Sequence, residues 1–232
     1  MSKSSTPDAL QLWNEVRDLD RSTPCITLGT NASWKLRTDP RHLLFTFARY
    51  KHAARLLPHE PDKTVLELGC GEGLGTLFLA ETAARVLAVD FDAFALEQAR
   101  THYATEKVEY RCADFLGSFF GAFQGIVSLD VIEHIDAAQE GAYCKTLVDN
   151  LAHGGVCVVG TPNESASPYA SEGSKIGHIN MYTAERLYAA MRRWFCNVFL
   201  LGINDEMLHT GFHPMCHYLL AVACNPCRRS DS

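Results

Sequence analysis

The stretch TVLELGCGEGLGTLFLA, residues 64–80, places four glycines at alternate positions between a short apolar run and a predicted helix. A phosphate-binding loop requires Lys followed by Ser or Thr after its last glycine, and this stretch contains no lysine. A dinucleotide-binding fingerprint requires a small residue at its sixth position, where the three possible registers place Leu74, Thr76 or Phe78. The pattern that remains is E-x-G-x-G-x-G, made of Glu67, Gly69, Gly71 and Gly73.

Composition limits the class of protein. The chain has 232 residues, of which 47% are hydrophobic, and this suits one domain with a sizeable core. Its net charge is −6 at pH 7 and no lysine- or arginine-rich block stands out, which argues against a nucleic-acid or membrane-surface partner. It has no long apolar span and no signal-peptide pattern, so we expect a cytoplasmic protein.

The nine cysteines are predicted to be reduced, because their number is odd and several lie in apolar runs. The cysteines expected to be buried are Cys112, Cys157, Cys196 and Cys224.

A metal site is not predicted. Cys224 and Cys227 form a C-x-x-C pair, but a structural zinc site needs a second ligand pair with matching spacing. Three late histidines recur every four residues, yet the glycine and proline between them disfavour the helix that would align them as ligands. These histidines are His209, His213 and His217.

Apolar segments alternate with helical patterns along most of the chain. Such alternation indicates an α/β protein with a doubly wound, mainly parallel sheet. Helices are predicted between the early strands, over residues 74–84 and 93–103, and again over 183–193. The predicted strands cover residues 64–69, 85–90, 108–114, 125–130, 154–162, 196–203 and 217–224.

Acidic residues lie in or end the first four predicted strands, where a doubly wound sheet binds its ligands. A carboxylate about 20 residues after the glycine loop can accept hydrogen bonds from ribose hydroxyls, and one after the third strand can accept from an adenine amine. A pyrophosphate would be repelled by these acids, whereas an amino group and a sulfonium would be attracted. The pattern therefore indicates an adenosine-type ligand without phosphates. The four acids are Glu67, Asp90, Asp114 and Asp130.

Four motifs follow one another: VLELGCGEG at 65–73, VLAVD at 86–90, CADF at 112–115 and SLDVIEHI at 128–135. In order and spacing they resemble the consecutive cofactor motifs of class I S-adenosylmethionine-dependent methyltransferases. The resemblance covers about residues 60–225 and implies S-adenosyl-L-methionine as the cofactor. It also implies a Rossmann-like sheet of seven strands, mainly parallel, with an antiparallel last strand.

The resemblance assigns ten residues to the cofactor site. Those that would border the methionine portion are Glu67, Gly69, Cys70, Gly71 and Gly73. Those that would hold the ribose and adenine or complete the site are Asp90, Phe91, Asp114, Phe115 and Asp130. Plainer interpretations exist, because a strand-end Asp is often a helix N-cap and a loop-end Phe commonly packs in the core.

The segment GHINMYTAERL, residues 177–187, resembles one found after the fifth strand in methyltransferases of ubiquinone biosynthesis and of sugar or polysaccharide tailoring. It implies that the acceptor is a small molecule or a glycan precursor, methylated at oxygen. An N-methyltransferase of a small metabolite and a non-catalytic S-adenosylmethionine-binding module are the alternatives. Nucleic-acid amino-methyltransferases are disfavoured, because LDVIEH lacks the Asp/Asn-Pro-Pro-aromatic box of that class.

A hydroxyl acceptor must lose its proton during methyl transfer, so the reaction calls for a general base. His178 precedes Tyr182 in a long loop after the fifth predicted strand, and His134 follows the fourth. Both histidines are candidate catalytic residues, and Tyr182 is a candidate substrate contact. The alternative for His134 is a hydrogen bond to backbone at the start of a helix.

The predicted domains are an N-terminal arm and helical substrate lid over 1–59, the cofactor-binding domain over 60–227 and a tail over 228–232. Asp39 and Pro40 mark the start of the lid helix. Arg49 and Tyr50 in that helix are candidate substrate contacts, and Arg49 could instead pair with the carboxylate of the cofactor. An anionic substrate would explain the positive charge of the lid, and a solvated helix face is the alternative. The basic residues are Lys35, Arg37, Arg41, Arg49 and Lys51. We expect a monomer or homodimer.

Overall fold

The computed structural model of the protein describes residues 8–21, 23 and 25–227. The predicted tail, residues 228–232, lies outside the described residues, as do the first seven residues of the predicted arm. Within the described part of the chain, no helix is long and apolar enough to cross a membrane.

Eight strands form one sheet in the order β3-β2-β1-β4-β5-β8-β6-β7. Strands β1 to β5 pair in parallel, whereas β8 runs antiparallel to both β5 and β6. The predicted doubly wound sheet and its antiparallel last strand are confirmed. The structure adds a short edge strand, β7, so the sheet has eight strands instead of seven. The strands are β1 (Thr64–Leu68), β2 (Arg85–Asp90), β3 (Val108–Cys112), β4 (Phe123–Leu129), β5 (Leu151–Pro162), β6 (Phe195–Asn204), β7 (Met207–His209) and β8 (Tyr218–Pro226).

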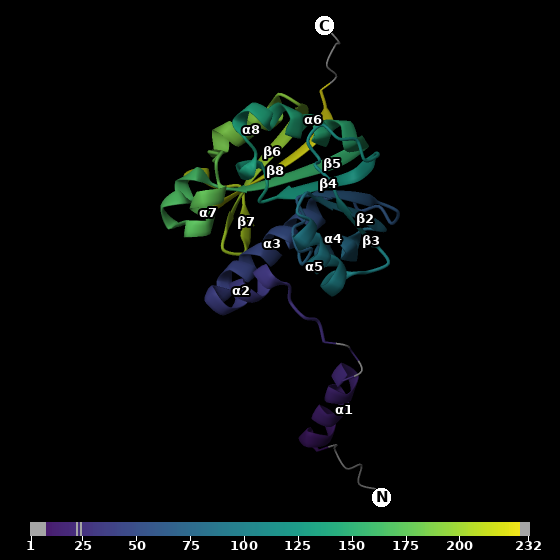
Figure 1. Ribbon diagram of the computed structural model, residues 1–232. Coiled ribbons are helices and arrows are strands. Elements are labelled where there is room, and N and C mark those ends of the chain that lie inside the picture. The colour runs from purple at the N-terminus through teal and green to yellow at the C-terminus, as the bar shows by residue number, and fades with distance from the viewer. Residues whose placement is uncertain (1–7, 22, 24, 228–232) are drawn as a thin grey trace, which may run out of the picture.

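Helices cover both faces of the sheet, with α6 and α8 above it and α3, α4 and α5 below it in Figure 1. The core is divided accordingly. Tyr143 and Leu187 belong to the buried cluster on one face, and Leu79 and Leu96 belong to the cluster on the other. The helices are α1 (Ala9–Arg21), α2 (Thr30–Thr38), α3 (Pro40–Leu56), α4 (Thr76–Thr82), α5 (Ala93–Tyr103), α6 (Glu140–Asn150), α7 (Glu172–Gly177) and α8 (Ala184–Arg192).

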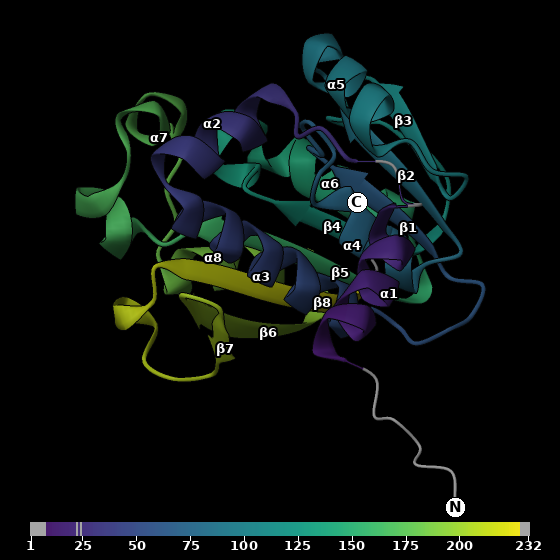
Figure 2. The same ribbon diagram turned by 90° about the horizontal axis from the view of Figure 1, so that it is seen from below.

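The N-terminal segment separates into two parts. In Figure 1, α1 stands apart from the sheet. In Figure 2, α2 and α3 cross in front of the sheet, over β4, β5 and β8. Asp39 and Pro40 occupy the predicted start of α3, but the Asp39 carboxylate makes no capping hydrogen bond and instead accepts one from Arg41 Nε at 3.3 Å.

All nine cysteines are free, but the predicted burial of four of them was largely wrong. Cys157 in the central strand β5 is buried and Cys224 in β8 is half-buried. Cys112 and Cys196 are exposed, because β3 and β6 lie toward the two edges of the sheet, where most side chains stay open to solvent.

Candidate active site

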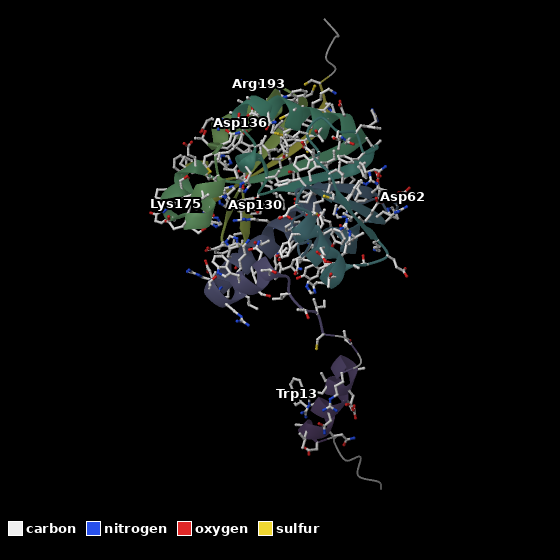
Figure 3. All side chains as sticks on the ribbon, in the orientation of Figure 1. Trp13, Asp62, Asp130, Asp136, Lys175 and Arg193 are labelled. Carbon is white, nitrogen blue, oxygen red and sulfur yellow. The ribbon has the colours of Figure 1, made fainter. Side chains whose placement is uncertain are left out.

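A cavity of about 740 Å³ lies at the carboxyl ends of β1 to β4, where a doubly wound sheet places its ligands. Figure 3 labels one lining residue, Asp130, in the middle of the molecule where α2 and α3 approach the sheet. Predicted site residues that line the cavity are Gly69, Gly71, Asp90, Phe91, Asp114, Phe115, Asp130 and His134. Glu72, within the predicted glycine loop, also lines the cavity, and lining residues that sequence reasoning missed include Asn31, Asp92, Phe94, Val131, Ile135 and Gln139.

The glycines after β1 serve two purposes. Gly71 has φ +53°, and a Cβ placed there would meet nothing within 4 Å, so the backbone is open to a ligand. Gly73 has φ +79°, and its Cβ would come within 2.7 Å of the Tyr110 hydroxyl oxygen. Gly73 therefore permits close packing. Cys70 is buried in the core, and neither Gly73 nor Cys70 lines the cavity.

Asp90 holds the glycine loop. Its Oδ2 accepts a hydrogen bond from the Gly71 N–H at 2.8 Å, and its Oδ1 accepts one from the Asp92 N–H at 2.9 Å. Asp92, and not Asp90, is the N-cap of α5. Each carboxylate oxygen of Asp90 keeps a further lone pair for a ligand hydroxyl.

The third acid, Asp114, is also not a helix cap. Its Oδ1 accepts a hydrogen bond from the Leu116 N–H at 3.0 Å, and the residue lines the cavity beyond β3. A lone pair on each of its oxygens stays available to a donor group of a ligand.

Aromatic rings form the other wall of the cavity. Phe91 is 75% exposed and Phe94 is 57% exposed, which is unusual for large apolar rings and suits stacking on a flat ligand. Phe115 is buried in the core and also lines the cavity. Phe94 was missed because its position in the first turn of α5 carries no sequence signal.

Glu67 and Tyr50 lie behind the glycine loop and do not line the cavity. The Glu67 carboxylate accepts hydrogen bonds from the hydroxyls of Tyr50 at 2.7 Å and Thr76 at 2.6 Å. Burial raises the pKa of Glu67 to about 7. Both side chains are thus engaged in joining α3 to β1 and α4, and the ligand contacts expected of Glu67 and Tyr50 stay predictions.

The buried Glu67 should make stability depend on pH. Its folded-state pKa of about 7 exceeds the ordinary value of 4.5, so the unfolded chain releases this proton first as pH rises. The stabilisation is present below about pH 4.5 and is lost through about pH 7, a change of up to about 3 kcal/mol. In urea unfolding, the free energy of unfolding of the Glu67→Gln variant relative to the wild type should therefore be higher at pH 8 than at pH 5. Parallel pH profiles of the two proteins would contradict this.

Arg49 is also engaged within the protein. Its Nη1 donates to Asp130 Oδ1 at 2.9 Å and Oδ2 at 3.0 Å, and its guanidinium lies 3.9 Å from the centroid of the Tyr218 ring. Arg49 is buried and is not a lining residue of the cavity. Arg49 therefore forms an ion pair that holds α3 to the end of β4, and its contact with a substrate or with the cofactor carboxylate stays a prediction.

Three side chains meet beyond the end of β4. His134 lies in the 3-10 turn η1 (Ile132–His134), and His178 is the C-cap of α7. Their ring centroids are 5.0 Å apart with the planes nearly perpendicular. Glu133 is fully buried beside them, and its Oε2 accepts a hydrogen bond from the Thr161 hydroxyl at 2.9 Å. Sequence reasoning missed Glu133, whose only signal was its place before His134.

Burial perturbs two of these groups. It raises the pKa of Glu133 well above the ordinary value, and the nearby Asp130 carboxylate adds to the effect. Burial also lowers the pKa of His178, and the His134 ring contributes in the same direction. A neutral imidazole beside a buried carboxyl group is an arrangement suited to handling a proton.

Tyr182 is a structural residue of the loop that carries His178. Its ring is fully buried, and its hydroxyl donates to Glu140 Oε2 at 2.6 Å and accepts from Asn180 Nδ2 at 3.1 Å. The Asn180 N–H also donates to the Glu133 carbonyl at 3.0 Å. These bonds fix the loop against η1, and the substrate contact expected of Tyr182 stays a prediction.

Comparisons with known proteins agree with this geometry. Residues 65–155 match the methyltransferase domain family. A probable S-adenosylmethionine-dependent methyltransferase of Mycolicibacterium smegmatis is 32% identical over 121 residues, which are 51% of this chain and 46% of that protein. A ubiquinone biosynthesis O-methyltransferase of Caulobacter sp. strain K31 is 33% identical over 118 residues, 49% of this chain and 45% of that protein. The chain therefore spans about half the length of these curated relatives.

Solved structures share the fold across most of the chain. The N-methyltransferase NodS from Bradyrhizobium japonicum WM9, in complex with S-adenosyl-L-homocysteine, has a TM-score of 0.60 at 21% identity. The match covers 90% of this chain and 97% of that chain. The sheet therefore has the Rossmann-like fold of S-adenosylmethionine-dependent methyltransferases. The family match over residues 65–155 and the curated relatives agree with the predicted family and with its cofactor, S-adenosyl-L-methionine.

Replacing Asp90 by Ala should weaken the binding of S-adenosylhomocysteine by about 1–3 kcal/mol, because charge-assisted hydrogen bonds to the ribose are lost. Calorimetry on the wild type and the variant measures the difference. Glu97→Ala is the matched control, since Glu97 is an exposed carboxylate on α5 outside the cavity lining. Equal affinities of a folded Asp90→Ala variant and the wild type would remove Asp90 from the site.

Proposed function

We propose that the protein transfers a methyl group from S-adenosylmethionine to a hydroxyl oxygen of a small molecule or glycan precursor. The observation that carries the proposal is the pairing of two imidazoles, His134 and His178, at 5.0 Å beside the cavity. An oxygen nucleophile must lose a proton, whereas a free amine needs no such help. The similarity to a ubiquinone biosynthesis O-methyltransferase supports the same acceptor atom.

The cleft fits this cofactor through the open backbone at Gly71, the lone pairs of Asp90 and the exposed ring of Phe91. When bound, S-adenosylmethionine supplies the methyl group, and its sulfur keeps the electron pair of the broken S–C bond. The neutral His178 imidazole takes the proton of the acceptor hydroxyl as the oxygen lone pair bonds to the methyl carbon. The enzyme otherwise contributes alignment of the two reactants.

In this proposal, the helices α2 and α3 act as the lid over the acceptor. Glu72 of the glycine loop accepts hydrogen bonds from the N–H groups of Asn31 at 2.7 Å and Ala32 at 3.3 Å, so the start of α2 is tied to the cofactor loop. This link couples the position of the lid to that of the loop that borders the cofactor. Loss of the Glu72 carboxylate would release α2 from the loop.

An anionic acceptor is supported by one basic residue of the lid. Lys35 is half-buried on α2, close enough to Asp130 for the two charges to interact, and it makes no ion pair with another described residue. Its ammonium group is therefore free to meet a carboxylate or phosphate of the acceptor. The basic side chains of Arg37, Arg41 and Lys51 are exposed, which fits a solvated helix face for these three.

Incubation with methyl-labelled S-adenosylmethionine and a metabolite extract tests the proposal. We expect the label in a methyl ether, identified by mass after separation, and faster turnover for hydroxyl acceptors that carry an acidic group. Label in an amine would instead identify an N-methyltransferase. Binding of the cofactor without turnover of any hydroxyl, carboxyl or amine acceptor would identify a non-catalytic binding module.

A further inference from the structure

We propose that Glu133, His134 and His178 form a binding site for one divalent metal cation at the acceptor end of the cavity. Each side chain offers one ligand atom, and these atoms all lie within 4.8 Å of one another. Two imidazole nitrogens and one carboxylate oxygen are a donor set that first-row divalent ions accept, with further positions left open for other ligands.

This site differs from the two candidate metal sites considered from the sequence, the Cys224–Cys227 pair and the three late histidines. Within the described part of the chain, Glu133, His134 and His178 are the one group of three side chains with converging ligand atoms. The three late histidines do not converge, since His217 Nε2 accepts from the Asp205 N–H and His209 contacts Cys216. The proposed ligands come from η1 and from the loop after β5, which only the folded chain brings together.

Glu133 supplies the strongest observation. Its side chain is fully buried, and Oε2 is satisfied by the Thr161 hydroxyl, but Oε1 is buried without any hydrogen-bond partner. A buried carboxylate oxygen without a donor is costly. A cation between Glu133 and the two imidazoles would satisfy this oxygen.

The orientation of His134 also suits a ligand. Its Nδ1 lies 2.8 Å from the carbonyl oxygen of Gly177. A carbonyl only accepts, so Nδ1 carries the hydrogen and the Nε2 lone pair is left available. Metal-bound histidines are commonly held in this way, with the second ring nitrogen donating to a backbone carbonyl.

The inference rests on the proposed function and refines the role of His178. A cation bound here would hold the acceptor hydroxyl oxygen and lower its pKa. The proton would pass to solvent, the oxygen lone pair would bond to the methyl carbon, and the sulfur would keep the electrons of the broken bond. His178 would then act as a ligand, and the cation would replace it as the group that makes the oxygen nucleophilic.

Binding of Mn²⁺ to EDTA-treated, dialysed protein tests the site by electron paramagnetic resonance, without reference to activity. Mn²⁺ is preferred to Zn²⁺ because it favours oxygen and nitrogen ligands, while the Sγ atoms of Cys196 and Cys227 lie 2.8 Å apart and would attract Zn²⁺. We expect one bound ion per chain and nitrogen couplings from two imidazoles in the pulsed spectrum. Each of Glu133→Gln, His134→Ala and His178→Ala should weaken binding by about 10-fold or more.

His209→Ala is the matched control and should bind Mn²⁺ like the wild type, because His209 lies outside the cluster. Thermal unfolding checks that each variant is folded. If Glu133→Gln does not fold, the two histidine variants alone test the site. No binding to the wild type, or binding that survives all three ligand substitutions, overturns the inference. Methyl transfer that persists in EDTA without Mn²⁺ binding would overturn the site and leave the proposed function standing. Mn²⁺ binding without turnover of any hydroxyl acceptor would support the site and overturn the proposed function.

Discussion

The His178→Ala variant is expected to transfer methyl groups about 10²–10⁴ times more slowly than the wild type, while its affinity for S-adenosylhomocysteine changes little. His178 contacts His134 from the C-cap of α7 and is not among the residues that line the cofactor cavity. The substitution therefore removes the proton acceptor, or one ligand of the cation, without removing a cofactor contact. Single-turnover rates and calorimetry measure the two effects separately.

Two further variants sharpen this result. His178→Gln keeps a hydrogen-bonding side chain but cannot act as a base near neutral pH, so its rate should fall nearly as far as that of His178→Ala. His153→Ala should keep the wild-type rate, because His153 is exposed near the start of β5, at the end of the strand that lies away from the cavity. A glutamine variant with nearly the wild-type rate would mean that His178 only braces the loop, and His134 would become the next candidate.

The Asp130→Asn variant is expected to lose about 2–4 kcal/mol of the free energy of unfolding, because it leaves the Arg49 charge buried without its partner. The Arg49 side chain is 8% exposed and that of Asp130 is 34% exposed, which places the effect toward the lower part of the range for buried pairs. Asparagine tolerates the φ of +57° at this position, so the substitution removes the charge without straining the backbone. Denaturant unfolding measures the loss.

The pair of Glu109 and Arg111 provides a control for that measurement. Its side chains are 51% and 43% exposed, and Glu109→Gln should change the free energy of unfolding by less than about 0.5 kcal/mol. Asp130→Asn and Glu109→Gln variants of equal stability would show that the Arg49–Asp130 pair does not persist in solution.

Much of the cofactor side of the cleft was readable from the chain because its parts are local. The β-α alternation, the glycine loop and the acids at the strand ends each depend on residues close together in sequence. A doubly wound topology then brings these segments to one edge of the sheet. The directions of single side chains were less predictable: Asp90 supports the loop from inside the cleft, whereas Glu67 turns away from it to meet Tyr50 and Thr76.

The acceptor side depended on contacts between distant segments. Arg49 was expected to meet a substrate or the carboxylate of the cofactor, and only the packing of α3 against β4 brought it to Asp130, 81 residues away. Glu133 carried no pattern of its own, and its meeting with His178 required the loop after β5 to return over η1. From the sequence alone, the alternation of strands and helices, the glycine loop and the kind of cofactor it suits follow, because short-range patterns encode them. Which polar groups bind one another and which remain free was decided by the tertiary structure, because burial determines which partners a charge can reach.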